Sequence, residues 1–120
     1  MNFKKTLKSF KYAFQGIGDL ARFENNFRVH LFVVVVVILS SVTLRINRKE
    51  WMIVVFLIGF VLTAEAFNTA IEKICDFIHP EFHPDIGKIK DLAAGGVLIA
   101  VLTAVVIGLI IFVPKLIALL

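Results

Sequence analysis

Four polar side chains occur at helical spacing in a stretch that is otherwise mostly apolar. Glu65 is followed by Asn68, Glu72 and Asp76, at offsets of three, seven and eleven residues. At about 100° per residue these positions fall within an arc of roughly 80° on one α-helix. Glu65 lies deepest, fourteen residues beyond Trp51. A carboxylate at such depth in an apolar helix is costly and usually functional. The alternative is a carboxylate that pairs with a lysine only to fix helix packing.

Two more carboxylates, Glu24 and Asp91, are expected near the same membrane surface. Several carboxylates at one surface suit a hard cation such as Mg²⁺, and Mg²⁺ suits the phosphates of a nucleotide. Lys90 adds a positive charge beside Asp91, and the start of the helix that follows adds backbone N–H donors for phosphate. The sequence contains neither a Gly-x4-Gly-Lys loop nor a Gly-x-Gly-x2-Gly motif. A kinase with this sequence therefore differs in construction from soluble kinases.

His79 and His83 stand four residues apart on either side of Glu81. This spacing is compatible with two zinc ligands, but no third and fourth ligand stand out in the sequence. A polar contact within a loop is therefore the favoured interpretation.

The composition indicates the environment in which these residues work. Of 120 residues, 59% are hydrophobic, and the mean hydropathy is +0.92. A soluble domain of this size cannot bury so much apolar surface, so we expect a single membrane-embedded domain, residues 1–120. The formal charge of +4 fits a cytoplasmic membrane face, and no nucleic-acid partner is expected. The lone Cys75 excludes an intramolecular disulfide, and no cleavable signal is evident.

Four helical segments are predicted, which together make an all-α membrane protein. Residues 1–27 form an amphipathic surface helix in the membrane interface, because its apolar residues recur at spacings of three and four. Residues 29–44, 51–75 and 92–114 form three transmembrane helices. The apolar positions of the surface helix are Phe3, Leu7, Phe10, Phe14, Ile17 and Ala21, and the lysines on its other face are Lys4, Lys8 and Lys11.

Basic residues determine the expected orientation. Nine lysines and arginines lie on one side of the membrane and four on the other. The positive-inside rule therefore places the N-terminus and the loop 79–91 in the cytoplasm.

The third span also carries a small residue at every fourth position. Such a series lets helices approach closely, either within one chain or between chains. Its members are Gly96, Ala100, Ala104 and Gly108.

Taken together, these segments resemble the small prokaryotic diacylglycerol kinase family over nearly the whole chain. The most specific segment is Glu65-Ala-Phe-Asn-Thr-Ala-Ile-Glu72 followed by Asp76. It is similar to the family signature Glu-x2-Asn-(Ser/Thr)-Ala-Ile-Glu-x3-Asp. The other segments that carry the resemblance are Tyr12, Glu24-Asn-Asn-Phe-Arg28-Val-His30, Glu81-Phe-His83 and Lys90-Asp91.

The resemblance implies ATP-dependent phosphorylation of a lipid hydroxyl at a bacterial cytoplasmic membrane. The enzyme is then a homotrimer whose active sites, on the cytoplasmic side, are shared between subunits. Glu65 matches the general base, Asn68 supports the site, and Glu24 and Glu72 match the ligands of Mg²⁺ beside the nucleotide. The residues that match further nucleotide contacts are Tyr12, Glu81, His83, Lys90 and Asp91.

Two departures from the Gram-negative pattern bear on the substrate. Lys5 stands where Gram-negative members have arginine, and His30 stands where they have glutamate. Arg28 and His30 together are similar to the Gram-positive branch, which resembles undecaprenol kinase, so undecaprenol is the expected substrate and undecaprenyl phosphate the product. Diacylglycerol, converted to phosphatidic acid by the same mechanism, is the alternative substrate. A small membrane scaffold or ion-path subunit is the alternative that is not an enzyme.

Overall fold

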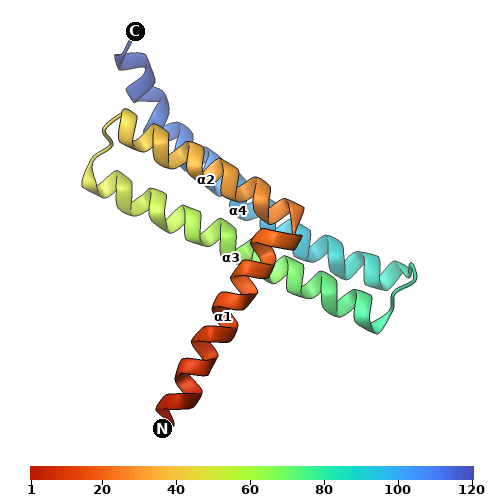
Figure 1. The fold of residues 1–120 in the computed structure, drawn as a ribbon. Helices are drawn as coiled ribbons and strands as arrows, with labels where there is room; N and C mark the ends of the chain where they lie inside the picture. Colours follow the sequence, from red (N-terminus) through yellow and green to blue (C-terminus); the bar gives the residue numbers. More distant parts are fainter.

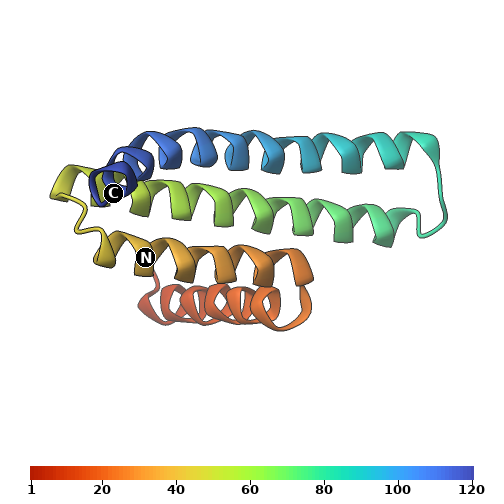
Figure 2. The same cartoon turned by 90° about the horizontal axis from the view of Figure 1, so that it is seen from above.

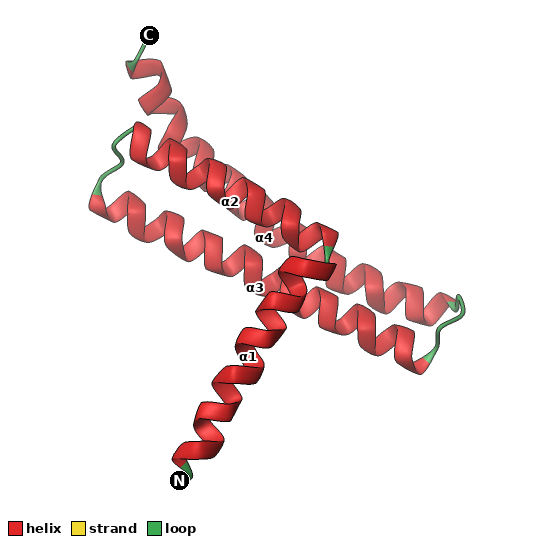
Figure 3. Cartoon of the chain, viewed as in Figure 1, coloured by secondary structure: helices red, strands yellow, loops and turns green.

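Four α-helices joined by short turns account for nearly the whole chain. The computed structural model describes residues 1–120. Its helices are α1 (Phe3–Phe23), α2 (Asn25–Thr43), α3 (Arg48–Ile78) and α4 (Pro84–Ala118). Of these, α2, α3 and α4 are long and apolar enough to cross a membrane. The predicted all-α architecture, with an N-terminal helix ahead of three membrane helices, is confirmed (Figure 3).

The three membrane helices run side by side, whereas α1 leaves the bundle at a steep angle (Figure 1, Figure 2). The most extensive packing joins α3 to α4, and α2 packs on α3. The hairpin of α3 and α4 projects beyond the junction of α1 with α2 (Figure 1). No residue of α1 is buried, and Phe10 and Phe14 are exposed. An amphipathic helix in this position has its apolar face available to the membrane interface.

The helix bounds differ from the predicted segments at most ends. The first helix ends at Phe23 rather than at residue 27, because Glu24 has extended backbone (φ −104°, ψ 111°) and separates α1 from α2. The membrane helices all begin earlier than the predicted spans 29–44, 51–75 and 92–114, and α3 and α4 also end later. Hydropathy marks only the apolar part of a helix, and the polar turns at its ends remain helical.

A capping box starts α3. The Oδ1 atom of Asn47 accepts a hydrogen bond from the backbone N–H of Glu50, and Oε1 of Glu50 accepts one from the backbone N–H of Asn47, both at 2.9 Å. These bonds satisfy two donors that would otherwise be unpaired. The preceding turn contains Arg45 with a φ of 53°, a left-handed conformation that costs a non-glycine residue about 1 kcal/mol.

The last turns of α4 are tied to the same capping box. The helix continues through Pro114, although a proline removes one backbone hydrogen bond and crowds the turn before it. The next residue, Lys115, pairs with Glu50 at 3.0 Å between Nζ and Oε1. This ion pair holds the end of α4 against the start of α3.

Hydroxyl groups within the membrane helices bond to their own helix. Ser40, Ser41, Thr43 and Thr103 each donate to the carbonyl four residues earlier, at 2.7 to 2.8 Å. Because the hydrocarbon core holds no water, such bonds satisfy polar groups that lipid cannot.

The interior of one chain is small. Ile46, Val54 and Ile111 form a buried cluster near the turn between α2 and α3. Ala100, a member of the small-residue series, is 1% exposed, so part of that series serves packing within the chain. Most large apolar side chains of α2, α3 and α4 are exposed, which suits contact with lipid or with other copies of the chain.

Candidate functional site

The polar stripe on α3 becomes more exposed towards the end of the helix. Glu65 and Asn68 are buried, Glu72 is half-buried and Asp76 is exposed. At about 1.5 Å per residue, Glu65 lies roughly 21 Å along the axis from Trp51, and Glu72 roughly 32 Å. A hydrocarbon core is about 30 Å thick. If Trp51 anchors one interface, Glu65 therefore lies inside the opposite boundary and Glu72 lies at it.

The polar neighbour of Glu65 is His30, which lies on α2. The Nε2 atom of His30 is 3.4 Å from Oε2 of Glu65, and the two side chains are 20% and 3% exposed. No lysine or arginine lies within ion-pair distance of Glu65. A buried carboxylate without a partner is costly, and the imidazole of His30 is the polar side chain that lies beside it.

Asn68 lies one turn further along α3 and orients Glu72. Its Nδ2 atom donates to Oε1 of Glu72 at 3.2 Å. Its Oδ1 atom is buried and has no hydrogen-bond partner in the chain. An unpaired buried acceptor costs about 1–3 kcal/mol, and this oxygen lacks a donor that the chain itself supplies.

Lys73 neutralises Glu24 at the junction of α1 and α2. Its Nζ atom is 3.0 Å from Oε1 of Glu24. Arg28 bridges the same junction, because its Nη1 atom donates to the carbonyl of Arg22 at 3.2 Å, a favourable place for a cation at the end of α1. The junction therefore holds Glu24 against the residue that follows Glu72 in α3.

Lys90 and Asp91 are the seventh and eighth residues of α4, which begins at Pro84. The N–H donors expected at a helix start therefore lie in the first helical turn, just after Pro84, and not beside Lys90, because the polar residues before Leu92 are helical. The ammonium of Lys90 donates to Oδ1 of Asp76 and joins the two arms of the α3–α4 hairpin. Asp91 is exposed and forms no ion pair. In this part of the hairpin the carboxylate of Asp76 is thus neutralised by Lys90, whereas the carboxylate of Asp91 has no partner.

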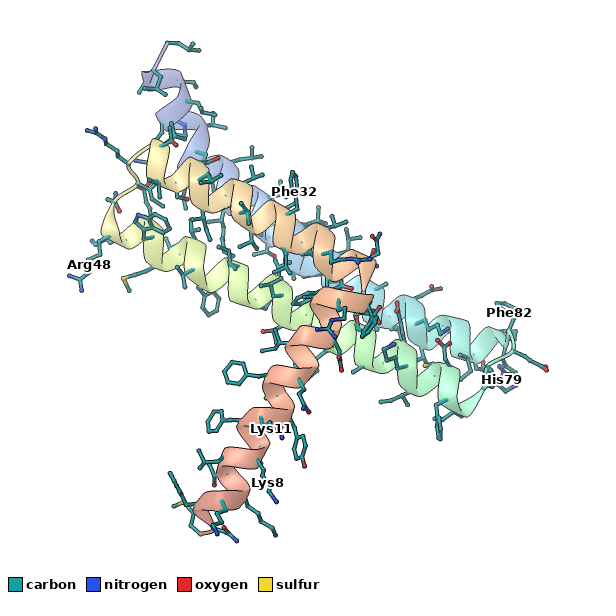
Figure 4. The ribbon with its side chains drawn as sticks, viewed as in Figure 1. Lys8, Lys11, Phe32, Arg48, His79 and Phe82 are labelled. Atoms are coloured by element: carbon teal, nitrogen blue, oxygen red, sulfur yellow. The ribbon has the colours of Figure 1, made fainter.

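Three of the predicted nucleotide contacts lie apart from these carboxylates. Tyr12 is exposed on α1, and twelve helical residues place it about 18 Å from Glu24. Glu81 and His83 lie in the turn between α3 and α4. Figure 4 shows His79, at the start of this turn, at the far end of the hairpin. Within one chain Tyr12 is thus remote from Glu24, whereas Glu81 and His83 follow Asp76 by five and seven residues.

The histidines of this turn contact the turn itself. The Nδ1 atom of His79 is 2.7 Å from the carbonyl oxygen of Glu81, and the rings of His79 and His83 meet edge to face at 5.3 Å. His83 caps α4, because its Nδ1 atom accepts a hydrogen bond from the backbone N–H of Asp85 at 3.1 Å. These contacts agree with the loop interpretation of the histidine pair.

A cavity of about 640 Å³ lies between α1 and α3, next to Glu24 and Lys73. Gly16 of α1 and Ala66 and Ala70 of α3 contribute little side-chain volume to its walls. It is apolar along most of its length and polar where it reaches the ion pair. The remaining lining residues are Ala13, Ile17, Asp19, Leu20, Phe23 and Thr69.

The carboxylates suit Mg²⁺ that is also bound by a substrate. No three His, Cys, Asp or Glu side chains form a closed metal site within the chain. Mg²⁺ commonly uses one or two carboxylates together with water and phosphate oxygens, and the carboxylates of Glu24 and Glu72 have this chemistry. The unpaired Oδ1 atom of Asn68 adds a further hard oxygen beside Glu72.

The sequence does not indicate three contacts of this region, namely His30 with Glu65, Lys73 with Glu24, and Asp76 with Lys90. The sequence does contain a signal for the contact of His30 with Glu65, because His30 belongs to a series of α2 residues at helical spacings of three and four. The surrounding valine run is apolar on every side, however, and so conceals which face is buried. The series is Phe27, His30, Val34, Val37 and Ser41.

The family model described as prokaryotic diacylglycerol kinase matches residues 11–112. The chain belongs to this family. The matched region includes all of α2 and α3 and every predicted site residue from Tyr12 to Asp91. The family resemblance that rests on the signature from Glu65 to Asp76 is thereby confirmed.

Three relatives illustrate the similarity. Undecaprenol kinase of Bacillus subtilis is 40% identical over 109 residues, which is 91% of this chain and 89% of the relative. Diacylglycerol kinase of Synechocystis is 33% identical over 114 residues, 94% of this chain and 65% of the relative. Diacylglycerol kinase of Escherichia coli is 27% identical over 104 residues, 87% of this chain and 85% of the relative. The names of the relatives include both lipid alcohols considered from the sequence.

Proposed function

We propose that the protein is an undecaprenol kinase, which transfers the γ-phosphoryl group of ATP to the hydroxyl of undecaprenol. The products are undecaprenyl phosphate and ADP. The observation that carries the proposal is the buried Glu65, held by His30 near the boundary of a membrane helix in a chain of this family. The 40% identity to an undecaprenol kinase supports the choice of lipid, since the two diacylglycerol kinases are 33% and 27% identical.

Glu65 is the general base in this proposal. Its carboxylate takes the proton of the lipid hydroxyl while the hydroxyl oxygen attacks the γ-phosphorus and ADP leaves. A carboxylate just inside the hydrocarbon boundary reaches an alcohol that remains anchored in the membrane. Asn68 supports the site, because its unpaired Oδ1 atom can accept a hydrogen bond from that hydroxyl.

Glu24 and Glu72 are the proposed ligands of Mg²⁺. When bound with ATP, the ion offsets negative charge on the transferring phosphoryl group. The protein's own part is to hold the two carboxylates in place, through the α1–α2 junction for Glu24 and through Asn68 for Glu72. The further residues proposed to contact the nucleotide are Tyr12, Glu81, His83, Lys90 and Asp91.

The lipid is proposed to approach through the cavity between α1 and α3. The cavity opens beside an amphipathic helix, and its polar end lies at Glu24 and Lys73. Side-chain donors are few there, with Lys73 and Thr69 as the main ones. A polyprenol is a primary alcohol without ester carbonyls and needs few donors, whereas a diacylglycerol site gains selectivity from donors that meet its esters.

We further propose a homotrimer whose sites are shared between subunits. In one chain Tyr12 lies about 18 Å along α1 from Glu24, so a second copy offers the nearer route by which such a side chain reaches a nucleotide site. The exposed apolar surface of the membrane helices offers the contact area. The number of three subunits rests on the family resemblance.

The proposed location is the bacterial cytoplasmic membrane, with the N-terminus and the active site on the cytoplasmic side. The nine lysines and arginines on that side, against four on the other, support this orientation. ATP is available on the same side.

Diacylglycerol is the second candidate substrate, favoured by the relatives from Synechocystis and Escherichia coli. The test uses purified protein in vesicles that contain undecaprenol and diacylglycerol at equal surface density, with Mg²⁺ and ATP labelled in the γ-phosphate. We expect undecaprenol to be phosphorylated several-fold faster. A several-fold preference for diacylglycerol overturns the choice of lipid, and no labelled product from either lipid overturns the kinase assignment.

A further inference from the structure

The proposed reaction leaves a proton on Glu65 after every turnover. This inference rests on the proposed function, in which the Glu65 carboxylate accepts the proton of the lipid hydroxyl. The side chain of Glu65 is only 3% exposed. Direct loss of the proton to water is therefore obstructed, and the base needs a neighbour through which it is regenerated.

His30 is the group placed to receive that proton. Its Nε2 atom is 3.4 Å from Oε2 of Glu65, and its side chain is 20% exposed. His30 lies five residues after Asn25, the first residue of α2, or about 8 Å along the helix. His30 is thus a partly exposed neighbour of the buried carboxylate and lies near the start of α2.

Apart from His30, no ionisable group lies within ion-pair distance of Glu65. On α4, Asp91 is exposed and forms no ion pair. The remaining contacts are Glu24 with Lys73, Arg28 with the carbonyl of Arg22, Glu72 with Asn68, and Asp76 with Lys90.

We propose that His30 is the proton outlet of the active site and acts through Glu65 without touching the substrate. The protonated carboxyl of Glu65 gives its proton to the lone pair on Nε2 of the neutral imidazole, which leaves a carboxylate and an imidazolium. The imidazolium releases the proton on Nδ1 to water or buffer at the membrane surface, and exchange with water restores the starting tautomer. One proton enters from the lipid and one leaves to solvent in each turnover.

His30→Gln separates this role from packing, because glutamine places a polar side chain beside Glu65 but cannot take up its proton. Steady-state phosphorylation of undecaprenol is measured in vesicles at low buffer concentration. We expect kcat to fall about tenfold or more, with the KM values for ATP and lipid within about twofold of wild type. We also expect a larger solvent deuterium isotope effect on kcat, and recovery of kcat as imidazole is added. His30→Ala, which leaves space for imidazole, provides a second variant for the rescue.

The matched control is His79→Gln, which makes the same change in the α3–α4 turn, where Nδ1 meets the carbonyl of Glu81 rather than a carboxylate. It should show neither the larger isotope effect nor the response to imidazole. A wild-type kcat in His30→Gln overturns the role of His30 as proton outlet. A reduced kcat that added imidazole restores in neither His30→Gln nor His30→Ala overturns it as well. In both cases wild-type phosphoryl transfer keeps the kinase assignment intact. A wild-type protein that phosphorylates no lipid overturns the proposed function, and the outlet with it.

Discussion

Glu65→Gln is the substitution that most directly tests the proposed base. Glutamine has nearly the same volume as glutamate and fits the same buried position between α2 and α3. The change removes the carboxylate that accepts the proton and leaves an amide opposite Nε2 of His30, 3.4 Å away in the wild-type structure. The variant therefore alters the chemistry of the site with little change in packing.

The structure gives the expected size of the effect. Stability should change by less than about 1 kcal/mol, because an amide and a neutral imidazole can share a hydrogen bond and no unpaired charge is left buried. Turnover should fall by about two to four decades, the usual contribution of a general base. No other carboxylate replaces Glu65 beside His30, since no other one lies within ion-pair distance of that imidazole.

The assay is the initial rate of phosphorylated lipid formation at saturating ATP and Mg²⁺, with unfolding in detergent measured in parallel. Glu50→Gln is the matched control, because Glu50 is a half-buried carboxylate at the other end of α3, paired with Lys115. That control should keep wild-type kcat. A Glu65→Gln variant with turnover within about threefold of wild type would remove Glu65 from the role of general base.

Three further predictions concern the metal ligands, the assembly and the fold. Glu24→Ala and Glu72→Ala should each raise the Mg²⁺ concentration for half-maximal activity. The double variant should be less impaired than the sum of the two single effects. Mg²⁺ titrations identical to that of the wild-type protein would exclude both residues from the metal site. Glu65→Gln and Glu24→Ala chains are co-expressed and assayed at a Mg²⁺ concentration too low for Glu24→Ala alone to be active. Some activity should return, because one shared site can collect both intact residues, whereas a fully active monomer in detergent would contradict a shared site. Asn47→Ala should lower the free energy of unfolding by about 1 kcal/mol through loss of the α3 cap, without affecting kcat; an unchanged unfolding midpoint would count against the cap.

Much of the architecture could be predicted from the sequence because bilayer thickness constrains it. Apolar runs of sufficient length indicate membrane helices whatever their neighbours are. Glu65 and Asn68 could be placed on one face by helical periodicity alone, and both are buried in the structure. The helix ends were less predictable, since polar turns such as those before Trp51 and before Leu92 are helical without being apolar.

The partners of the acidic residues could not be predicted, because they depend on how the helices pack. Sequence spacing relates residues on one helix, but His30 meets Glu65 only where α2 crosses α3, and Lys73 meets Glu24 only where α1 turns into α2. In the valine-rich part of α2 every face is equally apolar, so periodicity does not reveal which side turns inward. The sequence by itself therefore determined the membrane helices and the acidic face of α3. The tertiary structure decided which groups neutralise that face, because packing across helices sets the distance between charges that lie far apart along the chain.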